Sequence, residues 1–278
     1  MAVVTTRRTT LGFDHGADRG GFDHLIEFAG VSLSFKGLKA LDDVSFHVDD
    51  GELFAIIGPN GAGKTSIFNC LNGVYKPQEG AIRWKGEDIM GRRPDRIAEL
   101  GVARTFQNIE LFAHMTVLEN IMLGRHVRTK TSWWDGALWI GPAKKEELTN
   151  RAVVEDIIDL LEIARWRKYP VAMLPYGIQK RVELGRALAM KPELLLLDEP
   201  VAGMNLEETE DMARFILDIR EELGIAMILV EHDMGLVMDI ADRVMVIDFG
   251  ERIATGIPSE IQSNPNVIKA YLGEEMDL

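Results

Sequence analysis

The feature that most constrains this chain is a glycine-rich octapeptide, Gly58-Pro-Asn-Gly-Ala-Gly-Lys-Thr65, which follows an apolar run. The run, Leu53–Ile57, is short, uninterrupted and ends at Gly-Pro, which predicts a buried strand. Helical spacing follows from about Lys64 to Asn72. Strand, G-x-x-x-x-G-K-[ST] loop and helix in this order are typical of a phosphate-binding loop. We therefore predict an α/β core built around a nucleotide site.

The residue types in this loop explain the predicted chemistry. Its glycines let the backbone curl and bring N–H groups close to phosphate oxygens, and the following helix adds its dipole. The Lys64 ammonium would lie on the β- and γ-phosphates, and the Thr65 hydroxyl would be a ligand of Mg²⁺. The predicted nucleotide-binding residues of the loop are Gly58, Pro59, Asn60, Gly61, Ala62, Gly63, Lys64, Thr65 and Ser66.

A second apolar run, Leu194–Leu197, leads into Asp198-Glu199-Pro200. Carboxylates at the carboxyl end of a buried strand face the ligand crevice of an open α/β sheet. Two such charges are costly unless a cation compensates them. We predict that Asp198 holds Mg²⁺, directly or through water, and that Glu199 orients and deprotonates the attacking water.

Two further polar residues are weaker candidates. His232 follows the predicted strand Ala226–Val230, where a histidine taken alone is more often structural. The phosphate loop and Asp198-Glu199 upstream favour contact with the γ-phosphate instead. Gln107 ends Arg104-Thr-Phe-Gln, and its neutral amide could sense whether Mg²⁺ or water occupies the site. We therefore include His232 and Gln107 in the predicted catalytic set, with Lys64 and Glu199, and Gln107 also among the metal contacts, with Thr65 and Asp198.

The remaining pattern predicts the organisation of the chain. Residues 24–28, 31–35 and 44–48 alternate apolar and polar side chains, which predicts antiparallel strands separated by Gly30 and Gly37. The segment 206–223 has helical periodicity with Gly224 at its end. Because that helix joins two apolar runs, we predict parallel strands with a right-handed crossover.

Other segments differ from this core. The stretch from about 108 to 178 has helical spacing and no buried strand run, so we predict an α-helical insertion. After Ile247 we predict a hairpin that turns near Phe249-Gly250. Two short helices follow, beginning at Pro258 and after Asn264, the second with Gly273 just past its end. Residues 1–24 are predicted to be a mobile tail, residues 25–273 one ATPase domain, and residues 274–278 a short tail.

Charge and hydropathy limit the class of protein. The net charge of −13 argues against a nucleic-acid scaffold. No stretch of 18 apolar residues occurs, and the N-terminus lacks the apolar core of a secretory signal. We therefore expect a soluble, intracellular chain that reaches a membrane only through a partner. The segment Trp133–Trp139 carries three of the five tryptophans, and either local packing or contact with a membrane partner explains it.

The order of these motifs resembles the ABC (ATP-binding cassette) ATPase family over roughly residues 25–273. Phe35 matches the aromatic residue that stacks on adenine, residues 58–65 match Walker A, and Leu194–Glu199 match Walker B with its catalytic glutamate. Gln107 matches the Q-loop and His232 the switch histidine. Residues 201–205 match the D-loop, with Asn205 where many members have aspartate. This resemblance implies a P-loop NTPase (RecA-like) core with an antiparallel β subdomain and an inserted α-helical subdomain.

Within the family, the chain is most similar to ATPases of high-affinity branched-chain amino acid importers. The stretches 104–107, 231–234 and 264–273 support this likeness. The resemblance implies ATP and Mg²⁺ as cofactors and two transmembrane permease subunits. It also implies a second ABC ATPase subunit, like or unlike this one, and indirect coupling to an extracytoplasmic solute-binding protein. The expected location is the cytoplasmic face of the inner membrane, as a peripheral protein.

One motif departs from the family pattern. The signature, usually Leu-Ser-Gly-Gly-Gln, is here Leu174-Pro-Tyr-Gly-Ile178. Tyr176 and Gly177 remain as contacts to the nucleotide of the opposite subunit. Pro175 has neither the serine hydroxyl nor an N–H. The resemblance therefore implies one donor fewer toward the partner's ATP, which could cost that site about 10²–10³ in rate.

Rival functions have to be weighed against this interpretation. A soluble ABC ATPase acting on DNA or ribosomes would normally carry coiled-coil insertions or two nucleotide domains, and a basic surface. This sequence has one phosphate loop, no long heptad tract and a net charge of −13, which argue against that function. A non-catalytic module would not need Lys64, Asp198 and Glu199 together. An ABC exporter subunit is disfavoured by the likeness to importers. The resemblance favours branched-chain amino acids as the transported substrate. Amides, urea and aromatic or other organic acids stay as alternatives, because the ATPase subunit does not touch the cargo in this architecture.

Overall fold

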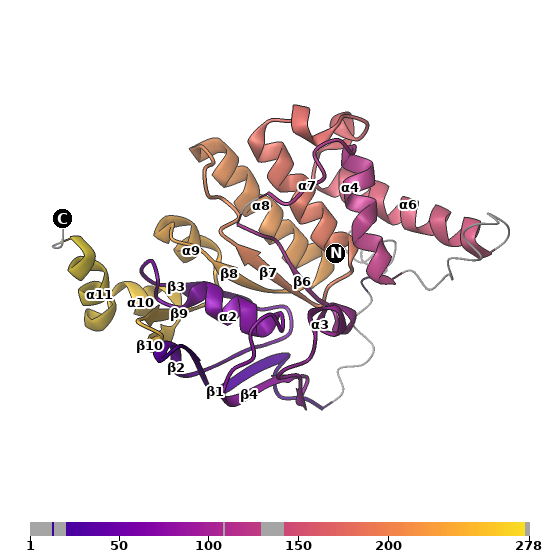
Figure 1. Ribbon diagram of the computed structural model, residues 1–278. Helices are drawn as coiled ribbons and strands as arrows, with labels where there is room; N and C mark the ends of the chain where they lie inside the picture. The colour runs from indigo at the N-terminus through magenta and orange to yellow at the C-terminus, as the bar shows by residue number, and fades with distance from the viewer. Residues whose placement is uncertain (1–12, 14–20, 108, 129–141, 276–278) are drawn as a thin grey trace.

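The computed structural model describes Phe13 and residues 21–107, 109–128 and 142–275. Its described strands form two sheets, one of order β2-β1-β4-β5 and one of order β10-β9-β3-β8-β7-β6 (Figure 1). The first is antiparallel throughout, and the second is parallel apart from the β9–β10 hairpin. This arrangement confirms the predicted α/β class with an antiparallel β subdomain.

The strands are β1 (Ile26–Phe35), β2 (Leu38–Val48), β3 (Leu53–Ile57), β4 (Glu79–Trp84), β5 (Glu87–Asp88), β6 (Val102–Arg104), β7 (Leu194–Asp198), β8 (Ala226–Val230), β9 (Arg243–Asp248) and β10 (Glu251–Gly256). The α-helices are α2 (Lys64–Leu71), α3 (Pro94–Leu100), α4 (Val117–Leu123), α6 (Pro142–Leu160), α7 (Tyr176–Ala189), α8 (Leu206–Leu223), α9 (Met234–Ile240), α10 (Pro258–Gln262) and α11 (Pro265–Glu275). Short 3₁₀ turns lie at Gly124–Arg128, Ala164–Trp166 and Val171–Met173.

The six-stranded sheet separates two hydrophobic cores. Because successive side chains of a strand point to opposite faces, alternate residues of β3 enter different cores. Leu53 and Ala55 join the core formed with α4 and α6 to α9. Phe54 and Ile56 join the core formed with α2, α3 and the antiparallel sheet. Strands buried on both faces explain the uninterrupted apolar runs of β3, β7 and β8.

The antiparallel sheet differs from its prediction at Gly30. The segments 24–28 and 31–35 were expected as two strands, but they form the single strand β1. The pairing register of β1 with β2 shifts between Phe28 and Val31. Gly30 lies in this interval with φ of 61°, and its carbonyl oxygen would be 2.4 Å from a Cβ added at Gly80. Gly30 therefore makes a bulge inside a strand instead of ending one.

The helical part between the described residues 109 and 178 packs above the six-stranded sheet, where α4, α6 and α7 lie together (Figure 1). Residues 113–117 and 169–172 run side by side through backbone hydrogen bonds, with Val171 N donating to Met115 O at 3.0 Å and Val117 N donating to Tyr169 O at 3.1 Å. The segment Trp133–Trp139 lies outside the described residues.

The chain ends follow the predictions with two differences. The hairpin turns at Phe249-Gly250, and α10 and α11 begin at Pro258 and Pro265, as expected. Gly273 was expected just past the last helix, but α11 continues through it to Glu275. Phe13, within the predicted tail, is buried in the core beneath α6 to α9. Across the described ranges, no helix is both long and apolar enough to cross a bilayer.

Candidate functional site

The predicted site segments follow four neighbouring strands of one sheet. The order β3-β8-β7-β6 is parallel throughout, so the carboxyl ends of these strands meet at one edge. The phosphate loop follows β3, His232 follows β8, and Gln107 follows β6. Asp198 ends β7, and Glu199 comes directly after it. Strand order therefore aligns segments that are separated by up to 174 residues in the chain, from Gly58 to His232.

The phosphate loop requires glycine at defined positions. Gly58 and Gly63 have φ of 154° and 111°. A Cβ at Gly58 would lie 1.9 Å from Ile247 O, and one at Gly63 would lie 2.7 Å from Ala40 O. Gly63 is also the N-cap of α2, and no side chain caps that helix. The loop thus packs closely against the backbone of Ile247 and Ala40. The N–H groups at the start of α2 are not capped by a side chain and can donate to an anion.

Lys64 and Thr65 take different positions at the start of α2. Lys64 is buried and its Nζ donates to the carbonyls of Gly58 and Pro59, the latter at 2.9 Å. The ammonium therefore lies against the loop. Thr65 is exposed and Ser66 is half-buried.

Asp198 is paired with a cation inside the protein. Arg104 Nη2 lies 2.6 Å from Asp198 Oδ2, and the two side chains are only 9% and 6% exposed. Arg104 Nη1 donates to Asn69 Oδ1 of α2 at 2.8 Å, and its guanidinium lies over the ring of Phe68. Because a buried carboxylate needs a partner charge, Arg104 stabilises the position of Asp198.

Glu199 lies next to Gln107. Gln107 Nε2 donates to Glu199 Oε2 at 2.7 Å, so these two predicted residues do meet. Glu199 has φ of 47°, a conformation that L-residues rarely adopt, and its N–H donates to Val230 O of β8 at 2.9 Å. Strained backbone held by its surroundings is concentrated at functional sites, which supports a special role for this glutamate.

His232 is positioned by its neighbour Glu231. Glu231 is fully buried and accepts hydrogen bonds from the N–H groups of Val201 at 3.0 Å and His232 at 3.1 Å. Burial raises the pKa of the Glu231 carboxyl. The His232 side chain is 64% exposed. One buried carboxylate thus joins the loop after β7 to the loop after β8.

Three predicted contacts lie apart from the strand-end row. Phe35 ends β1 in the other sheet, and its ring is 44% exposed and meets Tyr75 edge-to-face at 5.0 Å. Tyr176 hydroxyl donates to Ala202 O at 3.1 Å. Gly177 lies against Glu208, whose Oε1 would be 2.7 Å from an added Cβ. Tyr176 and Gly177 are therefore packed on the segment 202–208 of their own chain.

Pro175 occupies the N-cap of α7, and no side-chain hydrogen bond caps that helix. The extended backbone of Pro175, with ψ of 150°, is the conformation that an N-cap requires. The missing hydroxyl therefore leaves the helix start in place while removing one donor from it.

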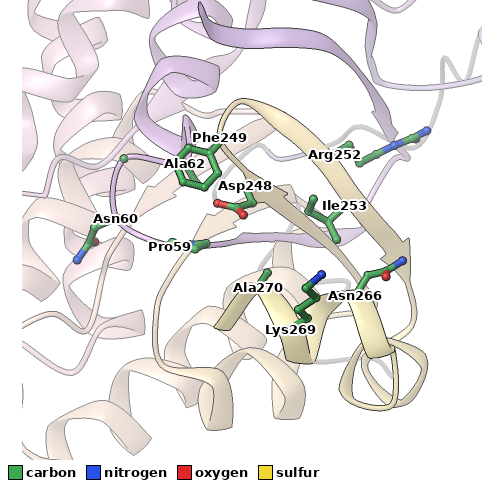
Figure 2. Close-up of a pocket in the computed structure, with 11 residues that line it drawn as sticks. Pro59, Asn60, Ala62, Asp248, Phe249, Arg252, Ile253, Asn266, Lys269 and Ala270 are labelled. Carbon is green, nitrogen blue, oxygen red and sulfur yellow. The ribbon is translucent and has the colours of Figure 1, made fainter. Parts of the chain in front are cut away.

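A cavity of about 630 Å³ adjoins the outer side of the phosphate loop. Figure 2 shows it between Pro59 and Asn60 of that loop, the β9–β10 hairpin and α11, which contributes Asn266 and Lys269. Phe249 lies beside Ala62 at the hairpin tip and is 86% exposed. The last helix, α11, therefore lies across this cavity from the nucleotide loop.

Three residues of the site were not assigned from the sequence. Arg104 was noted only as part of a motif, and Glu231 likewise, while Thr105, whose hydroxyl oxygen lies 3.3 Å from Asp198 N, was given no role. Their partners are 30 to 94 residues away in the chain. The one available signal was a charged residue at the end of an apolar strand, which is expensive to bury unless paired.

These residues fit a nucleotide with a bound cation. The loop has no room for side chains at Gly58 and Gly63, and α2 begins without a side-chain cap. A positive side chain, a hydroxyl and a buried carboxylate are the donor set that a phosphate–Mg²⁺ pair requires. The chemistry that this donor set suits is therefore phosphoryl transfer to water.

Comparisons with known proteins agree with this geometry. Residues 41–202 match the family model described as ABC transporter, and residues 251–277 match the model described as branched-chain amino acid ATP-binding cassette transporter. The second match covers β10 and α11, which line the cavity beside the phosphate loop.

Individual relatives span nearly the whole chain. It is 40% identical over 250 residues to the high-affinity branched-chain amino acid transport ATP-binding protein BraF of Pseudomonas aeruginosa, covering 90% of this chain and 98% of the relative. It is 41% identical over 253 residues to LivG of Escherichia coli strain K12, with the same coverage.

Among solved structures, MJ1267, an ATP-binding cassette of an ABC transporter in its ADP conformation, superimposes with a TM-score of 0.78 at 30% identity, covering 90% of this chain and 98% of that one. The fold is therefore the P-loop NTPase fold of these cassettes. The chain belongs to the ATP-hydrolysing ABC transporter family, in the group of the branched-chain amino acid transport ATP-binding proteins.

Proposed function

We propose that this chain is the ATPase subunit of an importer for branched-chain amino acids or related small organic solutes. The observation that carries the proposal is the row of strand ends, where the phosphate loop, His232, Asp198-Glu199 and Gln107 follow four adjacent parallel strands. Relatives of 40% and 41% identity are named for branched-chain amino acid transport.

In this proposal Lys64, Thr65 and Asp198 hold Mg²⁺-ATP, and Phe35 stacks on adenine. Bound Mg²⁺ would supply charge neutralisation at the β- and γ-phosphates. Glu199 orients the attacking water and accepts its proton, and Gln107 holds the Glu199 carboxylate at 2.7 Å. His232 contacts the γ-phosphate from the next strand end.

The proposed partners are two permease subunits, at the cytoplasmic face of the cell membrane, with a solute-binding protein on the other side. An exposed apolar surface formed by Phe112, Tyr169 and Met173 suits a permease. These side chains are 58%, 47% and 71% exposed. Tyr169 lies on one of the two segments joined by backbone hydrogen bonds, and Phe112 and Met173 directly adjoin the pair Ala113–Ala172, whose N–H to O distance is 3.0 Å. Clustered apolar side chains on a protein surface are typical of interaction sites.

Substitution of that surface tests the permease contact. Met173→Asp and Phe112→Asp should abolish co-purification with the permease subunits while ATP binding by the free chain stays within twofold. Leu148→Asp, an equally exposed apolar position on α6, is the matched control and should leave co-purification intact. Retention of the permease by both charged variants would contradict this contact.

The cargo is tested in the organism that encodes the chain. Deletion should abolish high-affinity uptake of radiolabelled leucine, isoleucine or valine, and wild-type protein but not Glu199→Gln should restore it. Uptake of urea, short amides and aromatic acids is measured in parallel. Loss confined to one of those would replace the amino acids as cargo, and unchanged uptake of every solute would contradict the importer function.

We propose further that the partner ATPase is an unlike chain. Pro175 at the start of α7 gives the nucleotide of the opposite subunit one hydroxyl fewer. This chain's phosphate loop, Glu199 and His232 would form one fully active site with the partner's signature, and the partner's nucleotide would meet the weaker one.

Purified protein discriminates these arrangements. The chain alone should hydrolyse ATP far more slowly than the complete pair, and Pro175→Ser should raise the rate of the site that it faces by up to about 10²–10³. Cooperative hydrolysis by the chain alone, at the full rate of the complex, would overturn the asymmetry.

A further inference from the structure

One face of the signature helix α7 holds the backbone of the loop that carries Gln107. Lys180, Glu183 and Arg186 follow one another at three-residue spacing, which places them on the same side of a helix. Lys180 Nζ donates to Gln107 O at 2.9 Å, and Glu183 Oε1 accepts from Phe106 N at 3.2 Å. Arg186 Nη1 donates to Glu110 O. All three contacts are with backbone atoms.

This contact is buried and charged. Lys180 and Glu183 are 3% and 2% exposed, and Lys180 Nζ lies 3.8 Å from Glu183 Oε2. A buried ion pair of this kind is weak evidence for stability, because apolar side chains of similar volume often serve as well. Stability alone therefore does not explain why Lys180 and Glu183 are hydrogen-bonded to the backbone of Gln107 and Phe106.

Residues 104–107, which contact α7, in turn contact Asp198 and Glu199. Arg104 pairs with Asp198 Oδ2, and Gln107 donates to Glu199 Oε2 at 2.7 Å. Thr105 Oγ1 lies 3.3 Å from Asp198 N. Continuous contacts thus run from α7, through residues 104–107, to Asp198 and Glu199.

We propose that Lys180 and Glu183 are positioning residues for hydrolysis, which hold Gln107 where its amide meets Glu199. The inference rests on the proposed roles of Gln107 and Glu199. The face of α7 that carries Lys180 and Glu183 would thus support ATP hydrolysis in the same chain, whereas the signature at the start of α7 faces the nucleotide of the partner. Lys180 and Glu183 touch no substrate in this scheme and act through Gln107 alone.

The test measures ATP hydrolysis and stability in the complete transporter. Lys180→Met should lower kcat at least tenfold and leave KM for ATP within threefold, because the phosphate loop is untouched. Arg181→Met is the matched control: Arg181 adjoins Lys180 but pairs with Asp211 and lies over Phe215, on the side of α7 toward α8. Its kcat should stay within twofold.

Two combinations separate positioning from folding. In Lys180→Met/Glu183→Leu both members of the 3.8 Å buried pair are removed together, so Tm should return toward wild type while kcat stays low. In the Gln107→Ala background, Lys180→Met should cause no further loss of kcat, because the Gln107 side chain through which Lys180 acts is already absent. Recovery of kcat together with Tm, or additive losses with Gln107→Ala, would overturn the proposal.

The outcome is distinguishable from failure of the proposed function. If Gln107→Ala and Glu199→Gln alone leave kcat at the wild-type level, the roles of those residues are wrong. If both lower kcat and Lys180→Met does not, only the positioning role is wrong.

Discussion

Gln107 and Glu199 are 92 residues apart in the chain, yet Gln107 Nε2 donates to Glu199 Oε2 at 2.7 Å. The contact exists because β6 and β7 are parallel neighbours, so the residues that follow them emerge at the same edge of the sheet. Arg104 and Asp198 meet at the same edge through a 2.6 Å ion pair. The predictions below for Glu199, Arg104 and Glu231 concern residues held by such contacts across strand ends.

Glu199→Gln should bind ATP but turn over about 10²–10⁴-fold more slowly, because the amide cannot accept the proton of water. The variant keeps an oxygen that can accept from Gln107, so the fold of the site is retained. Turnover is measured by phosphate release, and binding by retention of labelled ATP on gel filtration. Glu207→Gln, an exposed carboxylate on α8, is the control. Normal turnover in Glu199→Gln would rule out Glu199 as the base.

Arg104→Met should reduce the free energy of unfolding by about 3–5 kcal/mol, since it leaves the Asp198 charge buried without its partner. Arg104→Met/Asp198→Asn should recover much of this loss, because no charge is then left unpaired. Urea denaturation checks both variants.

A surface pair provides the comparison for Arg104. Arg83 and Glu27 are 2.9 Å apart but 40% and 39% exposed, so Arg83→Met should cost no more than about 1 kcal/mol. Equal losses for Arg83→Met and Arg104→Met would show that the burial of the Arg104–Asp198 pair has no energetic effect.

Gly58→Ala and Gly61→Ala should differ sharply although both glycines belong to the phosphate loop. A Cβ at Gly58 would collide with Ile247 O at 1.9 Å, so we expect a loss of more than about 4 kcal/mol or no folded protein. Among the described residues, and apart from its two chain neighbours, no atom lies within 4 Å of a Cβ at Gly61, whose φ is 81°. Its cost should be only the backbone term, about 1–2 kcal/mol. Similar denaturation midpoints for the two variants would contradict this difference.

Glu231→Gln should change how stability varies with pH. Burial raises the pKa of Glu231 above its ordinary value of 4.5, so the folded state retains a proton that the unfolded state releases. That contribution is complete below pH 4.5 and is lost as pH rises through the folded pKa, by at most about 1.4 kcal/mol per pH unit.

The glutamine variant cannot titrate at position 231 and should lack this part of the slope. Urea denaturation of wild type and variant at several pH values above 4.5 measures the difference. Parallel stability curves for the two proteins would show that Glu231 has no raised pKa in the fold.

The sequence by itself determined what short-range patterns encode. The phosphate loop and the Asp198-Glu199 pair could be read because each is a few consecutive residues beside an apolar run, and burial on both faces leaves such runs unmistakable. The helix 206–223 was predictable for the same reason, since its period and Gly224 lie within one segment. The fold class followed from the order of these segments.

Only the tertiary structure decided which distant residues share the site. Arg104 meets Asp198, Glu231 holds the loop at Val201, and Lys180 holds Gln107, through side chains whose partners depend on strand order and helix packing. Gly30 became a bulge because β2 and β4 continue past it on both sides, and α11 passed Gly273 although glycine is common at helix ends. Local preferences of about 1 kcal/mol give way when long-range pairing and burial contribute more.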